Sequence, residues 1–204
     1  MLAAVAAMAA VIALANVLVQ VPVAARIGGL DLADILTWAA FVYPLTFLVN
    51  DLTNRILGPF AARRVVFVGF ALAVALSAAL ATPRIAMASG TAFLVSQLLD
   101  LVIFNRLREQ TWWQAPAFSS VVGATFDTVL FFWLAFGAAF VVLGSSPGFA
   151  QASAPLLGVL PAEAPRWISW ALGSLVVQLL MAGVALVPYR VVMGFVRPWR
   201  PAER

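Results

Sequence analysis

The feature that most restricts the fold of this chain is a set of six apolar runs, each long enough to cross a lipid bilayer as a helix. They cover residues 2–25, 35–57, 65–81, 85–104, 116–143 and 167–187. A helix needs about 20 mainly apolar residues to span a hydrocarbon core of roughly 30 Å. We therefore expect an all-α, polytopic membrane protein in which residues 1–204 form one transmembrane domain, a bundle of six helices.

The composition excludes several classes of function. Hydrophobic residues make up 64% of the chain and charged residues 10%, which leaves too few polar side chains for the surface of a soluble domain. The chain has no cysteine and no histidine. Because the usual zinc and haem ligands and an imidazole base are missing, we expect no metal, no cofactor and no enzymatic activity. The 12 basic residues, all arginine, form no basic face, so nucleic acid is not an expected partner.

The arginines also predict an orientation. Cytoplasmic loops of membrane proteins carry an excess of arginine and lysine. Nine arginines follow the even-numbered runs or lie in the C-terminal tail, whereas three, Arg26, Arg84 and Arg166, lie at the opposite ends of the runs. Both termini are therefore predicted to be cytoplasmic. The run 2–25 is interpreted as a retained membrane helix, because no basic residue precedes it as in a signal peptide.

The second apolar run ends in polar residues, which is unusual for a helix in lipid. Asn50, Asp51, Asn54 and Arg55 follow one another within two helical turns. A carboxylate in hydrocarbon costs roughly 2.5 kcal/mol or more, so it normally faces the interior of a bundle and has a partner. For Asp51 the nearest candidate is Arg55, one turn further on. Pro44 lies in the same run and is expected to kink the helix.

Three acids fall within the predicted membrane helices, namely Asp51, Asp100 and Asp127. Two interpretations are open. In the first, each acid pairs with a nearby arginine such as Arg55 or Arg106 and locks the bundle. In the second, the acids line a polar cavity, in which carboxylates and amides bind a planar or cationic solute and an aromatic ring stacks on it. A guanine-like edge suits this site, because its adjacent N–H and amino donors match one carboxylate.

Further features of the helices also have two interpretations. Asn16 and Gln20, one turn apart in the first run, either hold neighbouring helices together or line a site. Gly123, one turn before the acid of the fifth run, is expected to open space beside that acid. The segments FLVND (47–51) and FLVSQ (93–97) share their first three residues. This is either chance or a sign that two helices have paired roles around one cavity, as repeats do in transporters.

Three segments carry a resemblance to a known family. They are FVYPLTFLVNDLTNRILGPFAARRVVFVGF (41–70), SQLLDLVIFNRLR (96–108) and WWQAPAFSSVVGATFDTVLFF (112–132). They resemble the queuosine precursor transporter family, also called the vitamin uptake transporter family. The resemblance implies import of 7-cyano-7-deazaguanine or 7-aminomethyl-7-deazaguanine across the inner membrane of a bacterium, for salvage into modified tRNA. It also implies a bundle similar to the substrate-binding subunits of energy-coupling-factor transporters.

The polar residues in these segments form the predicted site. The expected substrate-binding residues are Asn50, Asp51, Gln97, Asp100, Ser119, Ser120 and Asp127. Structural polar contacts or ion pairs are expected from Asn54, Arg55, Asn105 and Arg106. Two functions stay open: a carrier that works alone, driven by protons through one buried aspartate, and a subunit that borrows a separate ATPase. A membrane enzyme or a purely structural protein is less favoured. The bilayer-facing surfaces leave room for a homodimer.

Overall fold

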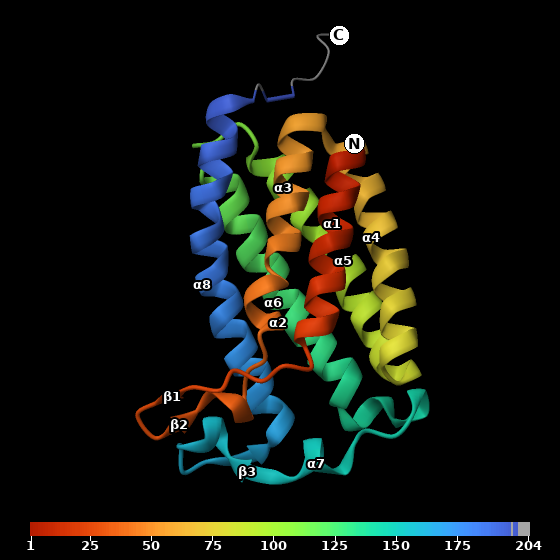
Figure 1. Cartoon of the computed structure of the whole chain (residues 1–204), viewed down its shortest axis with the longest axis vertical. Helices are drawn as coiled ribbons and strands as arrows, with labels where there is room; N and C mark the ends of the chain where they lie inside the picture. Colours follow the sequence, from red (N-terminus) through yellow and green to blue (C-terminus); the bar gives the residue numbers. More distant parts are fainter. Residues whose placement is uncertain (197, 200–204) are drawn as a thin grey trace.

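The computed structural model describes residues 1–196, 198 and 199 as a bundle of helices that run alternately in opposite directions (Figure 1). The long helices are α1 (Leu2–Leu18), α3 (Leu45–Leu57), α4 (Pro59–Leu80), α5 (Pro83–Leu107), α6 (Gln114–Phe136) and α8 (Arg166–Phe195). The short ones are α2 (Ala39–Val42), α7 (Gly148–Gln151) and the 3-10 turns η1 (Leu32–Asp34), η2 (Ala138–Leu143) and η3 (Leu156–Gly158). Two antiparallel hairpins, β1 (Arg26–Ile27) with β2 (Leu30–Asp31) and β3 (Ser153–Pro155) with β4 (Glu163–Pro165), lie at one end of the bundle. The start of α1 and the end of α8 lie at the other, which we call the terminal end.

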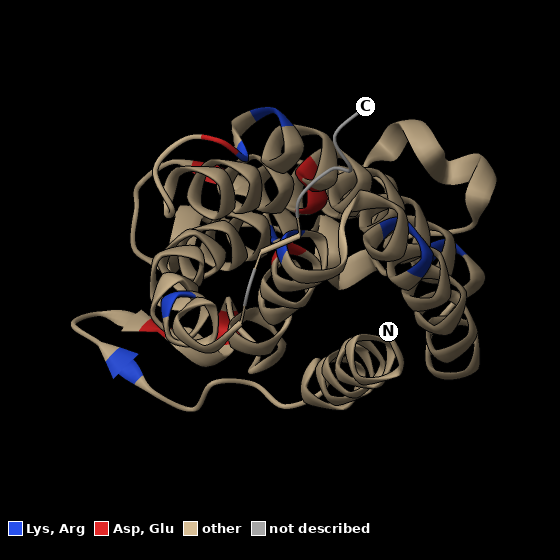
Figure 2. Cartoon of the chain, turned by 90° about the horizontal axis from the view of Figure 1, so that it is seen from above, with Lys and Arg blue, Asp and Glu red and all other residues tan. Residues whose placement is uncertain are grey.

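The predicted all-α membrane class is confirmed. Four helices, α4, α5, α6 and α8, are long and apolar enough to cross a membrane, with mean hydropathies of 1.5 to 2.1. Seen along the bundle, charged residues are sparse among the helices (Figure 2). Helix α1 is apolar but has 17 residues, and the second predicted span is divided between α2 and α3. The count of six spans therefore stays a prediction.

Prolines set two helix boundaries that differ from the apolar runs. Helix α1 ends at Leu18, earlier than predicted, and Pro22 pairs with Thr37 in an isolated bridge. Proline lacks the N–H that a continuing helix would need. The second run is divided at Pro44, which is the N-cap residue of α3 and follows the end of α2 at Val42. The kink expected from Pro44 is therefore present as a junction between two helices, in which Tyr43 and Pro44 keep helical backbone angles.

A buried arginine ends α6 at Phe136, although the fifth predicted run continues past this point. Arg84 is 2% exposed and donates from Nε and Nη2 to the carbonyl oxygens of Leu134 and Gly137, at 3.0 and 2.6 Å. Its Nη1 donates to the carbonyl oxygen of Gly144 at 2.8 Å. Carbonyls at a helix C-terminus lack donors within the helix, and a cation there also meets the negative end of the helix dipole. Arg84 therefore fixes the turn that follows α6.

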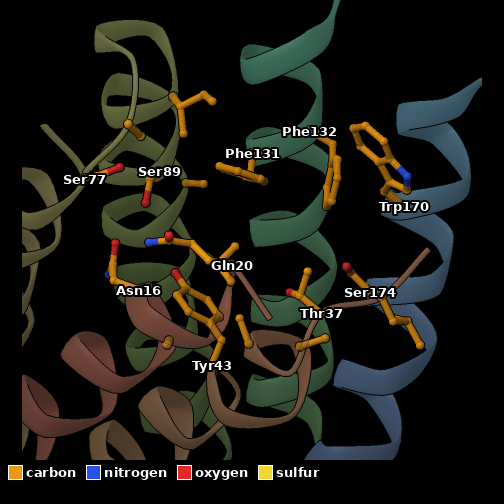
Figure 3. A pocket seen from close by; sticks show the side chains of 18 of the residues that line it. Asn16, Gln20, Thr37, Tyr43, Ser77, Ser89, Phe131, Phe132, Trp170 and Ser174 are labelled. Carbon is orange, nitrogen blue, oxygen red and sulfur yellow. The ribbon is translucent and has the colours of Figure 1, made fainter. Parts of the chain in front are cut away.

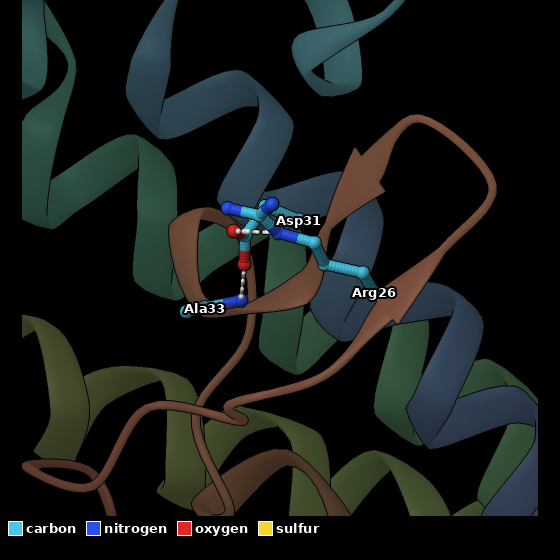
Figure 4. A network of polar contacts seen from close by, with 3 residues as sticks. All are labelled: Arg26, Asp31 and Ala33. Carbon is cyan, nitrogen blue, oxygen red and sulfur yellow. Dashed lines mark hydrogen bonds and ion pairs between the residues drawn. The ribbon is translucent and has the colours of Figure 1, made fainter.

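The hairpin of β1 and β2 is held by an exposed ion pair (Figure 4). Arg26 Nε donates to Asp31 Oδ2 at 2.9 Å, and the backbone N–H of Ala33 donates to Asp31 Oδ1 at 3.1 Å. These hydrogen bonds, that of Arg26 first, lower the pKa of Asp31. Because the pair is exposed, it adds little stability. The following segment is fixed to α8, since Trp170 Nε1 donates to the carbonyl oxygen of Asp34 at 2.8 Å.

The predicted orientation can be tested with single cysteines, because the chain has none of its own. Ile27 in the hairpin and Phe60 in the first turn of α4 are 67% and 66% exposed. With cytoplasmic termini, a membrane-impermeant maleimide should label Ile27→Cys in intact spheroplasts and Phe60→Cys only after permeabilisation. The unsubstituted chain is the control, since it offers no thiol. Labelling of Phe60→Cys in intact spheroplasts would contradict the orientation.

Candidate substrate site

A cavity of about 580 Å³ lies between the helices in the half of the bundle that carries the hairpins (Figure 3). Residues from α1, α2, α4, α5, α6, α7 and α8 line it, so segments from both ends of the sequence converge on one space. Its volume falls within the range typical of sites for small molecules. We refer to it below as the central cavity.

The central cavity has a polar side and an aromatic side (Figure 3). The amides of Asn16 and Gln20 lie on one side together with Tyr43, and the rings of Phe132 and Trp170 lie on the other together with Ser174. Of the two interpretations of Asn16 and Gln20, the structure therefore supports the lining of a site. Such a surface can hold a flat molecule between ring stacking and directional hydrogen bonds.

Among the predicted substrate-binding residues, Asp127 lines the central cavity. Its side chain is oriented from one side only: Oδ1 accepts from the hydroxyl groups of Tyr43 at 3.1 Å and Ser96 at 3.2 Å. Oδ2 has no hydrogen-bond partner within residues 1–196, 198 and 199. A carboxylate that is held by one oxygen and free at the other presents a fixed acceptor to a ligand.

The other six predicted binding residues meet in a buried network that lies outside the central cavity, toward the terminal end. Asn50 Nδ2 donates to Asp100 Oδ2 at 2.8 Å and to the carbonyl oxygen of Gln97 at 3.2 Å. Gln97 Nε2 donates to the hydroxyl of Thr46 at 2.9 Å. Beside them, the hydroxyl groups of Ser119 and Ser120 donate to Asp51 at 3.3 and 3.2 Å. The network joins α3, α5 and α6.

The ion pairs considered for the buried acids are wrong within the described part of the chain. Asp51 is bound by serine hydroxyls, as above, and not by Arg55. The longer side chain of Arg55 extends to the end of the bundle, where Nε donates to the Tyr189 hydroxyl at 2.9 Å and Nη1 to the carbonyl oxygen of Arg108 at 2.7 Å. Arg106 is exposed. The ion pair that the described residues contain is the one in the first hairpin.

Arg108 organises a polar cluster at the terminal end that the sequence analysis missed. Its Nη2 donates to Asn105 Oδ1 at 2.8 Å and to the carbonyl oxygen of Asn54 at 2.9 Å. Its guanidinium lies 5.6 Å from the centre of the Phe104 ring. The fourth apolar run was predicted to end near residue 104, whereas α5 continues to Leu107. This extra turn brings Arg108 to the end of the helix, against α3.

The space expected beside Gly123 is filled. A methyl group added to Gly123 would lie 2.6 Å from Cε1 of Phe47, whose ring is 1% exposed. The glycine thus allows α3 and α6 to pack closely and does not enlarge the central cavity.

This close approach predicts that Gly123→Ala destabilises the bundle. The added methyl group must displace a buried ring, and overpacking of this kind costs about 1–3 kcal/mol. A methyl group at Gly183 of α8 meets no atom within 4 Å, so Gly183→Ala is the matched control and should be neutral or stabilising. Thermal unfolding of the two purified variants in detergent measures the difference. Equal melting temperatures would contradict the prediction.

Comparison with known proteins gives a family for the chain. It matches the family described as "Putative vitamin uptake transporter" over residues 37–82 and 77–193. A "Probable queuosine precursor transporter" of Haemophilus influenzae is 36% identical over 153 residues, which cover 62% of this chain and 65% of the relative. The "Queuosine precursor transporter" of Escherichia coli is 37% identical over 147 residues, or 62% of this chain and 64% of the relative. The matches thus span slightly less than two thirds of each relative. No solved structure matches.

These findings agree with the resemblance noted in the sequence. The relatives are bacterial and are named as transporters, which supports the expectation that the chain is not an enzyme. With its four apolar helices, it is a multi-pass protein of the bacterial inner membrane. Because the matching segments cover more than half of the sequence, the chain belongs to the vitamin uptake transporter family.

Proposed function

We propose that this protein imports queuosine precursors, 7-cyano-7-deazaguanine and 7-aminomethyl-7-deazaguanine, across the inner membrane. The names of the two relatives support this function. The observation that carries it is the central cavity, which combines a carboxylate oxygen that has no partner in the described structure with amides and aromatic rings. Both precursors are flat, have adjacent N–H and amino donors, and carry a ring carbonyl.

In the proposed complex the donor edge of the deazaguanine faces Asp127. Oδ2 accepts from one donor, and Oδ1 retains acceptor capacity beside its bonds to Tyr43 and Ser96. The ring stacks on the aromatic side of the cavity, formed by Phe132 and Trp170. The amides on the polar side supply donors for the ring carbonyl.

The decisive experiment measures queuosine in tRNA, in a strain that can neither make nor import its precursors. Expression of this chain should restore queuosine when either precursor is supplied, whereas the empty vector should not. No recovery, with the protein present in the membrane, would overturn the proposal. Uptake by the purified chain in liposomes, without any ATPase, separates a carrier from a subunit of an ATP-driven system. Multi-angle light scattering of the purified chain in detergent tests the predicted homodimer.

The chemistry of the cavity also predicts selectivity between purines. A 7-deazaadenine has the same size but lacks the N–H and the carbonyl of the six-membered ring. The buried groups that should bind them are therefore left unpaired. The loss of affinity from unpaired buried groups exceeds the loss from a change of shape alone and reaches several powers of ten. We expect 7-deazaguanines to inhibit uptake of the labelled precursor at concentrations about 100-fold or more lower than 7-deazaadenine. Equal competition would place the substrate elsewhere in the bundle.

A further inference from the structure

Two carboxyl groups meet in the buried network outside the central cavity. Asp51 of α3 and Asp100 of α5 are at most 1% exposed and belong to one buried network, in which Asn50, the chain neighbour of Asp51, donates to Asp100 Oδ2 at 2.8 Å. The hydroxyl of Ser119 donates to Asp51 Oδ1 at 3.3 Å. Two carboxylates in one apolar interior without a counter-charge disfavour each other's ionisation, so a proton on one of them is favoured. We call Asp51 and Asp100 the carboxyl pair.

The groups that face the carboxyl pair in the described structure do not supply a compensating positive charge. Helix α6 contributes the hydroxyl groups of Ser119 and Ser120, and α3 and α5 contribute neutral amides. Helix α8 contributes the neutral phenol of Tyr189, which is 1% exposed. The guanidinium of Arg55 is bound to the Tyr189 hydroxyl and to the carbonyl oxygen of Arg108 at the terminal end.

Around the pair, the described structure has a surplus of acceptors. Three buried oxygens have no donor there: Oδ1 of Asn50, Oε1 of Gln97 and Oδ1 of Asp100. A buried acceptor without a donor loses the hydration it had in water and gains nothing in return. A proton on one carboxyl group adds a donor at this position. From this geometry we infer that the carboxyl pair binds one proton, which crosses the membrane together with the substrate.

Hydrogen bonds connect this proton site with the central cavity. The hydroxyl of Tyr43 donates to Asp127 in the cavity, and the carbonyl oxygen of Tyr43 accepts from the hydroxyl of Thr46 at 2.8 Å. Thr46 in turn accepts from Gln97, whose backbone carbonyl binds Asn50 beside the pair. A shift of Tyr43 when substrate occupies the cavity therefore reaches the pair through contiguous bonds. The inference rests on the proposed import and specifies its driving force.

In the proposed cycle the proton is a co-substrate. From the outside, where it is more abundant, it forms an O–H bond with one carboxylate of the pair. On the cytoplasmic side that bond breaks and water takes the proton, so one proton enters with each substrate molecule. With the membrane potential held at zero, one-to-one coupling to a difference of one pH unit supports an inside-to-outside ratio of a neutral substrate of about ten.

The test uses the full chain in liposomes and separates exchange from accumulation. Exchange of labelled for unlabelled precursor needs no driving force, whereas accumulation needs the pH difference. With acid outside and the membrane potential clamped, the wild type should accumulate precursor, and an internal pH dye should report acidification during uptake. Exchange without accumulation or acidification would overturn the inference and leave the proposed import intact. Absence of exchange itself would instead overturn the proposed import.

Substitution assigns the proton to the pair. Asp51→Asn and Asp100→Asn should abolish accumulation driven by the pH difference while exchange continues. Glu109→Gln, which changes an exposed acid just beyond the end of α5, is the matched control and should accumulate like the wild type. Full accumulation in both aspartate variants would overturn the assignment. If neither variant folds, infrared spectra of the wild type decide, because a protonated carboxyl band should persist at neutral pH, and its absence would overturn the inference.

Discussion

Asp127→Asn is expected to weaken binding of the precursor about 100-fold or more in a protein that still folds. The substitution keeps the shape of the side chain but replaces a charged acceptor by an amide whose NH₂ group opposes the donors of the substrate. A hydrogen bond to a charged group contributes about 1.5–3 kcal/mol, and the proposed complex has two of them. The hydroxyl groups of Tyr43 and Ser96 can still donate to the remaining amide oxygen. Binding of labelled precursor to the purified protein measures the loss, and size-exclusion chromatography confirms the fold.

Two kinds of control separate a direct contact from a change of charge. Asp34 also borders the central cavity but is exposed, so Asp34→Asn should leave affinity within a factor of about three. Tyr43→Phe and Ser96→Ala remove one donor each from Asp127 and should weaken binding by about tenfold or less, since a neutral hydrogen bond contributes about 1 kcal/mol. Wild-type affinity in Asp127→Asn would move the substrate out of the central cavity.

The second large effect concerns stability, and we expect it from Arg84→Ala. The change leaves the carbonyl oxygens of Leu134, Gly137 and Gly144 without the donors that Arg84 provides. The bond to Gly137 is buried, and an unsatisfied buried acceptor costs about 1–3 kcal/mol, so a loss of this size is expected. Arg84→Lys retains the charge but not the planar fork of donors and should recover part of the loss.

Thermal unfolding in detergent and the yield of monodisperse protein measure this effect. Arg166→Ala is the matched control, because Arg166 begins α8 at the same end of the bundle and is exposed. It should unfold like the wild type. A melting temperature of Arg84→Ala that equals that of Arg166→Ala would show that the turn after α6 does not depend on the buried guanidinium.

The sequence was sufficient for the class of fold because lipid imposes a simple rule on composition and length. Local chemistry was sufficient for the kink at Pro44. The end of α6 was not predictable in this way, because Gly137, which follows Phe136, is no stronger a stop signal than Gly123, which lies inside the same helix. Its cause is Arg84, about 50 residues earlier, and its donors reach the helix only in the folded bundle.

The site was predictable in proportion to its polarity. Acids and amides in apolar runs stand out, which is why Asp127 and the residues of the buried network were identified. Phenylalanine and tryptophan are equally common at positions that face lipid or pack in the core. The sequence therefore does not show that Phe132 and Trp170 line the central cavity. The spacing of Asp51 and Arg55 predicted that the two side chains contact each other. In the structure they bind to different helices, Asp51 to Ser119 of α6 and Arg55 to Tyr189 of α8.

The direction of α3 and α5 has a consequence for symmetry. These helices contain the similar segments FLVND and FLVSQ, and both run toward the terminal end, where Asn50 of one binds Asp100 of the other (Figure 1). Transporters with inverted repeats open to either side by exchanging the conformations of equivalent halves. Because α3 and α5 run in the same direction, they do not form an inverted pair that could exchange conformations in this way. One end of this bundle is closed by hairpins and the Arg84 turn, and the other by guanidinium groups on Tyr189 and backbone carbonyls. In the proposed import, entry and release of the solute would therefore break different bonds, so a mutation at one end should change the rate of one step and not of the other.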